Sequence, residues 1–299
     1  MIRRSVPPAH AFVVAMLGIA VFSAMDSMMK GLSIEIGAYN AMLWRSLFGA
    51  AIGGVGFVAM RTPWPARGVL ALHVARGITA GISVLLFFWG LARVPMAQGV
   101  ALSFIAPLIA LFLAAILLKE RIGRSAILAS ALAFAGVLVI LAAQAQSDMG
   151  PQAFRGAIAI LIAAVLYAFS LIVARRQSQR ADPMEVAFFL NLVATGLFAL
   201  AAPWWAVVPT VGQVPDLLVC AVFAVISMML LAWAYARAEA QVLIPVEYSA
   251  FVWAALLGWW VFGETVSALT IVGALMIVAG CLLAMRRSPP PIFPSEVAL

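Results

Sequence analysis

Two oppositely charged residues lie inside long apolar segments, where a charge is costly unless it has a partner or a function. Asp26 and Arg45 each fall about five or six residues from the same end of two neighbouring apolar runs. With a helical rise of about 1.5 Å per residue, both side chains are expected about 8–9 Å deep and close enough to pair. Lys30, one helical turn after Asp26, is a competing partner. Two interpretations stay open: a structural ion pair between helices, or part of an external gate or substrate path.

A second pair of charges matches in depth near the opposite ends of the apolar runs. Arg76 and Glu247 lie at similar distances from these ends. They are candidates for an inner gate, and Glu247 is also a candidate carrier of a coupling proton. A buried or interfacial salt bridge is the structural alternative.

Proline inside an apolar run frees a backbone carbonyl. Pro107 cannot donate a hydrogen bond, so the carbonyl of Ser103 loses its helical donor. At membrane depth such a carbonyl must face protein or a wet cavity. It is therefore a candidate substrate contact, and a kink satisfied by the Ser103 hydroxyl is the alternative. Pro245 frees the Gln241 carbonyl in the same way.

Hydroxyl and aromatic side chains at middle depth complete the set of expected cavity residues. Each of them is also a plausible helix-packing residue. The cavity candidates are Ser83, Ser103, Phe104, Pro107, Tyr167, Ser170, Ser227 and Tyr248.

The sequence carries no pattern for catalysis or metal binding. It has no Gly-x4-Gly-Lys-Ser/Thr and no His-Glu-x-x-His. His10 and His73 have no ligand partner nearby in sequence, and Cys220 and Cys281 are isolated in apolar runs. We therefore expect no catalytic residue, no metal, no cofactor and no enzymatic activity.

The elements that must position these residues are membrane helices. Of 299 residues, 66% are hydrophobic and 10% are charged, and the mean hydropathy is +1.13. A soluble domain has about 25% charged residues, which are needed to cover its surface. This composition excludes a soluble enzyme, a disordered protein and, despite the net charge of +7, a nucleic-acid-binding domain.

Continuous apolar runs of about 20 residues predict ten transmembrane helices rather than barrel strands. They are 11–31, 39–60, 69–91, 96–118, 124–143, 156–175, 184–206, 214–236, 241–263 and 267–285. The first run is long enough to be retained rather than cleaved as a signal peptide. The Pro-rich tail after Arg287 is expected to be extended or disordered.

Basic residues predict the orientation. With the N-terminus in the cytoplasm, 14 Lys and Arg residues fall on the cytoplasmic side and 3 on the other, while Arg45 lies within a helix. The positive-inside rule therefore places both termini in the cytoplasm.

The two halves of the chain are similar to each other. A shift of 144 residues superimposes residues less common than Ala and Leu: Ser83 on Ser227, Trp89 on Trp233, Glu120 on Glu264 and Gly136 on Gly280. Each half holds five helices, and an odd number makes the second copy enter the membrane from the opposite side. This is the plan of secondary transporters whose site lies near the midplane between the repeats.

Five segments resemble a known family. They are Phe104–Pro107, Ile116–Gly123 and the glycine-led run from Gly136 in the first half, and Trp253–Glu264 and Gly273–Gly280 in the second. The chain resembles the ten-helix drug/metabolite transporters of EamA type over nearly its whole length. The resemblance implies export of amino acids or other small metabolites from the bacterial cytoplasm.

Together these patterns predict an all-α membrane protein with ten transmembrane helices in two inverted five-helix repeats. The expected parts are a cytoplasmic segment 1–10, a first repeat 11–143, an external linker 144–155, a second repeat 156–285 and a cytoplasmic tail 286–299. The expected function is export of small metabolites, most simply amino acids, across the bacterial inner membrane by alternating access. The expected partners are the lipid bilayer and a small-molecule substrate, with no nucleic acid.

Several alternatives stay open at this stage. A lipid-handling membrane protein and a non-transporting scaffold remain as other functions. Small-residue faces at Ser46–Gly54 and at Gly77 and Gly81 suit packing within the chain or a homodimer.

Overall fold

The structure is a computed structural model that describes residues 8–118, 124–145, 150–177, 180–235 and 246–285. These residues form helices and no strands, which confirms the all-α prediction. The first half contains α1 (Pro8–Leu32), the π-helical turn η1 (Ser33–Gly37), α2 (Ala38–Ala59), α3 (Arg67–Leu91), α4 (Met96–Ser103), α5 (Ala106–Leu118) and α6 (Arg124–Ala145). The second half contains α7 (Gly150–Gln177), α8 (Pro183–Ala199), α9 (Ala202–Trp205), α10 (Gln213–Tyr235), α12 (Ala250–Phe262) and α13 (Ala268–Met285).

The helices are apolar enough to lie in a bilayer. Four described segments are long and apolar enough to cross a membrane, namely His10–Ala59, Arg67–Leu91, Gly150–Ala174 and Gln213–Ala234, and five shorter apolar helices accompany them. Each of the ten predicted spans overlaps one or more of these helices. Val55, Val58 and Leu128 are more than 70% exposed, and such side chains suit contact with lipid rather than water.

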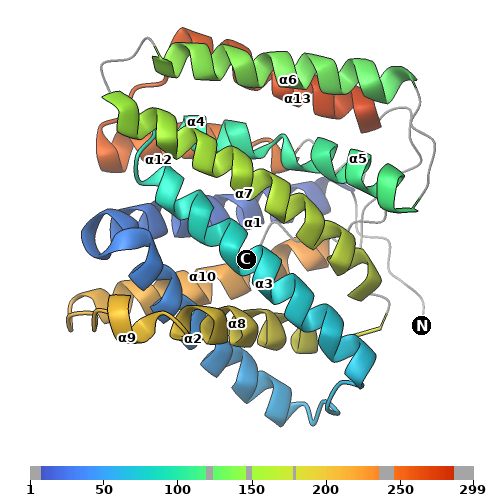
Figure 1. Ribbon diagram of the computed structural model, residues 1–299, viewed down its shortest axis with the longest axis vertical. Coiled ribbons are helices and arrows are strands. Elements are labelled where there is room, and N and C mark those ends of the chain that lie inside the picture. The colour runs from blue at the N-terminus through green and yellow to red at the C-terminus, as the bar shows by residue number, and fades with distance from the viewer. Residues whose placement is uncertain (1–7, 119–123, 146–149, 178–179, 236–245, 286–299) are drawn as a thin grey trace.

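The contacts between helices follow the internal repeat. We call α3 and α10 the third core helices of the two halves. The first helix of each half packs on the third core helix of the other half: α1 contacts α10, and α7 contacts α3. The equivalent helices α2 and α8 pair with each other, as do α6 and α13, and α4 and α12. Figure 1 shows the α6–α13 pair at one end of the molecule and the α2–α8 pair at the other. The helices of each half therefore pack mainly on helices of the other half rather than on each other.

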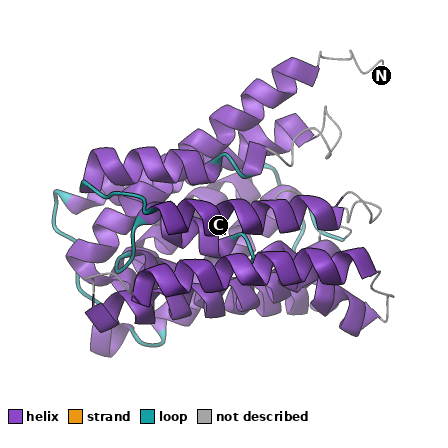
Figure 2. Cartoon of the chain, turned by 90° about the horizontal axis from the view of Figure 1, so that it is seen from above, coloured by secondary structure: helices purple, strands orange, loops and turns teal. Residues whose placement is uncertain are grey.

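Two helix boundaries depend on particular residues. Gly37 has φ = +81°, a backbone conformation that favours glycine, and it is the last residue of η1, directly before α2. Helix α7 begins at Gly150, inside the predicted linker 144–155, and Pro151 lies in its first turn, where the missing N–H breaks no helical bond. The connection between the halves is consequently shorter than predicted. Seen from above in Figure 2, the long helices run side by side with short connections.

Some predictions concern residues outside the described ranges. These are the segment 1–7, the tail 286–299, Glu120, and Pro245 with the Gln241 carbonyl.

Close backbone contact joins the α6–α13 pair. A Cβ atom placed on Gly136 would lie 2.6 Å from the carbonyl oxygen of Gly273, and one on Gly273 would lie 2.7 Å from the carbonyl oxygen of Gly136. Small residues allow such approach in membranes, where dispersion rather than water expulsion drives helix association. Glycine is therefore required on both helices at this crossing.

We predict that Gly136→Ala destabilises the protein by about 1–3 kcal/mol, because the added methyl group forces the two backbones apart. Gly196→Ala in α8 is the matched control, since a Cβ there meets nothing within 4 Å, and it is expected to be neutral or slightly stabilising. Thermal unfolding in detergent measures both variants. Equal unfolding temperatures for the two would contradict the close-contact interpretation.

Candidate functional site

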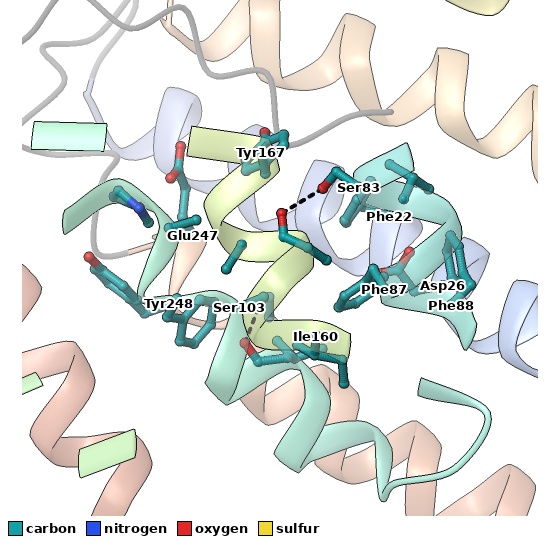
Figure 3. A pocket seen from close by; sticks show the side chains of 18 residues that line it. Phe22, Asp26, Ser83, Phe87, Phe88, Ser103, Ile160, Tyr167, Glu247 and Tyr248 are labelled. Atoms are coloured by element: carbon teal, nitrogen blue, oxygen red, sulfur yellow. Dashed lines mark hydrogen bonds between the residues drawn. The ribbon is translucent and has the colours of Figure 1, made fainter. Parts of the chain in front are cut away.

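A cavity of about 160 Å³ lies between the two halves of the molecule. Its walls come from α1, α3, α4 and α5 of the first half and from α7 and the start of α12 of the second. The lining is mostly aromatic and aliphatic, with two carboxylates and a few hydroxyl groups. Its polar and aromatic members are Phe22, Asp26, Ser83, Phe87, Phe88, Ser103, Phe104, Tyr167, Glu247 and Tyr248 (Figure 3).

Two turns that interrupt helical backbone meet at this cavity, one between α4 and α5 and one directly before α12. The helical run from Met96 is broken at Phe104 and Ile105, where N–H groups bond to carbonyls three residues back. The second half is broken at the equivalent place, Tyr248 and Ser249, which lie 144 residues further along the chain. The rings of Phe104 and Tyr248 meet edge to face, with centroids 5.1 Å apart. The pseudo-symmetric breaks therefore contact each other in the wall of the cavity, an arrangement typical of carrier sites.

Side chains partly compensate the broken backbone of the first half. The Ser103 hydroxyl donates to the carbonyl of Val100 at 2.7 Å, and the Cys281 thiol donates to the carbonyl of Phe104 at 3.3 Å. Pro107 lines the cavity one turn later. The break is thus stabilised by a local hydrogen bond and by a bond from α13. The apolar side chains of Phe104 and Pro107 at the break line the cavity.

The repeat mates Ser83 and Ser227 form equivalent bonds between the halves. The Ser83 hydroxyl donates to the carbonyl of Ala163 at 2.8 Å, and the Ser227 hydroxyl donates to the carbonyl of Gly18 at 2.9 Å. Each serine thus ties the third core helix of its half to the first helix of the other. Ser83 also lines the cavity, whereas Ser227 does not.

The remaining cavity candidates divide into two groups. Phe104, Pro107, Tyr167 and Tyr248 lie in the cavity wall. Ser170 is 2% exposed and lies outside it. The structure therefore gathers most of the predicted cavity residues and leaves Ser170 and Ser227 in helix packing.

Asp26 and Arg45 lie in the same buried region. Each is 5% exposed, and their charges interact. Among the described residues, however, no ion pair within 4.0 Å joins them. The Asp26 carboxylate lines the cavity, whereas Arg45 does not, and its Nη1 lies 3.9 Å from Met42 Sδ. The two residues are neighbours without a direct salt bridge.

Arg76 and Glu247 are placed differently from each other. Glu247 lines the cavity, and Arg76 is buried and donates to Gln177 Oε1 at 2.7 Å. The inner-gate pairing of these two residues stays a prediction.

Sequence reasoning missed a buried polar network beside Arg76. His73 is fully buried, its Nε2 lies 2.7 Å from Glu185 Oε1, its Nδ1 contacts Gln177, and its ring stacks on Phe189. Glu185 is 112 residues from His73 in sequence, so no local spacing could have indicated the pair. This network ties α3, α7 and α8 together at one end of the bundle.

A second buried cluster was also missed, and we call it the Lys30 cluster: Lys30, Val94, Met96 and Glu264. Lys30 is 2% exposed and donates to the carbonyl of Val94 at 2.7 Å and to the carboxylate of Glu264. The other oxygen of Glu264 accepts from the N–H of Met96 at 2.7 Å. The cluster joins the end of α1, the α3–α4 connection and the end of α12. The only sequence signal was the repeat match of Glu264, which did not indicate Lys30 as its partner.

Among the described residues, no group of three or more His, Cys, Asp or Glu side chains is placed to hold a metal ion.

Comparison with known proteins decides the family. The profile of the EamA-like transporter family matches residues 10–142 and 154–286. The chain belongs to this family. Its two matched segments correspond to the two repeats, so the resemblance noted from the sequence is confirmed. The protein is a multi-pass membrane transporter of the drug/metabolite transporter superfamily, and its relatives are named for small-molecule substrates.

Curated relatives of this EamA-like transporter cover nearly its whole length. It is 26% identical to the pseudopaline exporter of Pseudomonas aeruginosa over 92% of this chain and 95% of the relative. It is 28% identical to the riboflavin transporter of Rhizobium johnstonii over 95% of this chain and 94% of the relative. A solved crystal structure with 19% identity matches with a TM-score of 0.59 and covers 93% of this chain and 97% of its own, which supports the fold.

We predict that Lys30 and Glu264 are strongly coupled. Lys30→Met and Glu264→Gln each lower the thermal stability, because each leaves a buried partner without its bonds. The double variant is expected to lose less than the sum of the two, with a coupling of about 1–3 kcal/mol. Unfolding in detergent measures this cycle. Glu35→Gln, an exposed acid beyond the end of α1, is the control for loss of a carboxylate, and strict additivity would show that the cluster is not a unit.

Proposed function

We propose that this transporter exports small organic metabolites from the bacterial cytoplasm by alternating access, with amino acids as the leading substrate class. The observation that carries the proposal is the cavity between the repeats, with turns in the backbone at the equivalent positions Phe104 and Tyr248 in its wall. Carriers with inverted repeats bind their substrates at such a place. A substrate-sized cavity favours a carrier over a scaffold without transport activity. A lipid-handling protein would instead need a path open to the bilayer.

The size of the cavity supports a small substrate. An apolar cavity of about 150 Å³ holds one benzene molecule, and this cavity measures about 160 Å³. An amino acid with an apolar side chain suits that space, its side chain among the phenylalanine rings and its polar end at a carboxylate or hydroxyl. A three-ring flavin is larger, so the substrate of the riboflavin-transporting relative is not transferred to this chain.

The Lys30 cluster supports alternating access. It binds the ends of α1 and α12 to the α3–α4 connection, at the end of the bundle that the distribution of basic residues places outside. We infer that this cluster closes the external side in the present state, and that transport requires it to open. The same distribution supports an inner-membrane location with both termini in the cytoplasm.

Counterflow in proteoliposomes tests the carrier function. Vesicles loaded with unlabelled substrate are expected to accumulate the labelled compound transiently, because exchange through one site needs no energy source. The panel contains apolar amino acids, nucleotide sugars and quaternary amines. Accumulation is expected with an apolar amino acid and not with nucleotide sugars, which exceed the cavity. Absence of accumulation with every compound would contradict the proposal.

A proton gradient tests the coupling role of Glu247. If this carboxylate carries the coupling proton, a pH gradient accelerates export by the wild type, and Glu247→Gln loses that acceleration while it retains counterflow. Glu35→Gln provides the matched control, because Glu35 is exposed and is not part of the cavity lining. If the export rate is the same with and without the pH gradient in both the wild type and Glu247→Gln, the proton role of Glu247 is excluded.

A further inference from the structure

The cavity lining is unbalanced in charge. Two carboxylates, Asp26 and Glu247, belong to its described lining, and no lysine, arginine or histidine does. Figure 3 shows the two acids on opposite sides of the cavity, with Asp26 beside Phe87 and Phe88 and Glu247 nearer Tyr167. A ligand inside therefore meets two acidic residues and no basic side chain of that lining.

Asp26 carries the stronger part of this argument. It is only 5% exposed, yet no hydrogen bond or ion pair within 4.0 Å involves its carboxylate among the described residues. The basic residue whose charge interacts with it, Arg45, lies outside the cavity lining. A buried carboxylate without bonded partners is costly, and a positively charged hydrogen-bond donor in the cavity removes that cost.

The surrounding rings favour the same kind of ligand. Phe22, Phe87 and Phe88 line the cavity together with Asp26, and Phe104 and Tyr248 line it further along. Aromatic faces attract organic cations, and the attraction increases when both groups are shielded from water. The same rings accommodate an apolar group of about the size of benzene or an aliphatic side chain.

We propose that Asp26 recognises the ammonium group of the substrate, and that this recognition makes small primary amines with one compact apolar group the preferred ligands. The inference rests on the proposed export of small metabolites and, among them, places amines ahead of amino acids. Amino acids enter the site through their ammonium group. Their carboxylate finds no basic partner in the described lining, so an amine without the carboxylate binds more tightly than the corresponding amino acid.

A matched ligand series tests this on the purified wild-type protein. Isothermal titration calorimetry in detergent at pH 7 compares 3-methylbutylamine, leucine and 4-methylpentanoate, which share one apolar group and differ in charge. We expect the amine to bind at least tenfold more tightly than leucine, and the acid not to bind measurably. Binding of the acid as tight as that of the amine would overturn the inference, and so would no binding of any of the three.

Variants at Asp26 test the residue itself. Asp26→Asn is expected to weaken amine binding at least tenfold, and Asp26→Glu to retain most of it. Asp216→Asn, the same substitution at an exposed site in α10, is expected to leave binding unchanged. Amine binding by Asp26→Asn equal to that of the wild type would overturn the assignment. The ligand series uses the wild-type protein, so it still tests the proposal if the variants misfold.

The two proposals fail in different ways. Counterflow with any metabolite preserves the carrier function even when the order of the three ligands contradicts the role of Asp26. Binding of the amine without counterflow of any compound would preserve the role of Asp26 and contradict the carrier.

Discussion

The bilayer requires every backbone polar group at its depth to find a partner within the protein, and the rest of this structure depends on that constraint. A helix meets the requirement by itself, so an interruption is tolerated only where protein or a cavity covers it. Here the interruptions at Phe104 and Tyr248 lie against each other, and side chains such as Ser103 and Cys281 bond to carbonyls at the first of them. The irregular backbone and the cavity therefore occur together for one physical reason.

The internal repeat converts this local feature into a shared site. Because α1 packs on α10 and α3 on α7, each half supplies walls that the other half needs. The bonds of Ser83 and Ser227 repeat the same exchange at the level of single hydroxyl groups. A site at such an interface changes shape when the halves move relative to each other, which is the physical requirement for a carrier.

The buried charges have distinct surroundings. Lys30 and Glu264 satisfy each other and two backbone groups, so they form a closed polar unit at one end of the bundle. His73, Glu185, Gln177 and Arg76 form another network between α3, α7 and α8. Asp26 has no such bonded partners among the described residues and borders the cavity. Charges that are bonded within the protein stabilise one arrangement, whereas a charge at a cavity is available to a ligand.

The sequence by itself determined the helical class and the repeat, and six of the eight cavity residues that it predicted lie in the cavity wall. Hydropathy reports the lipid environment directly, and a shift of 144 residues aligns Ser83 with Ser227 without any knowledge of contacts. Only the tertiary structure decided the partners. Depth along a helix matched Asp26 with Arg45, but depth does not give the direction in which a side chain points. Lys30, which the sequence offered as another partner of Asp26, bonds to Glu264, 234 residues away. Long-range pairs of this kind leave no local spacing, because the packing of helices from both halves brings them together.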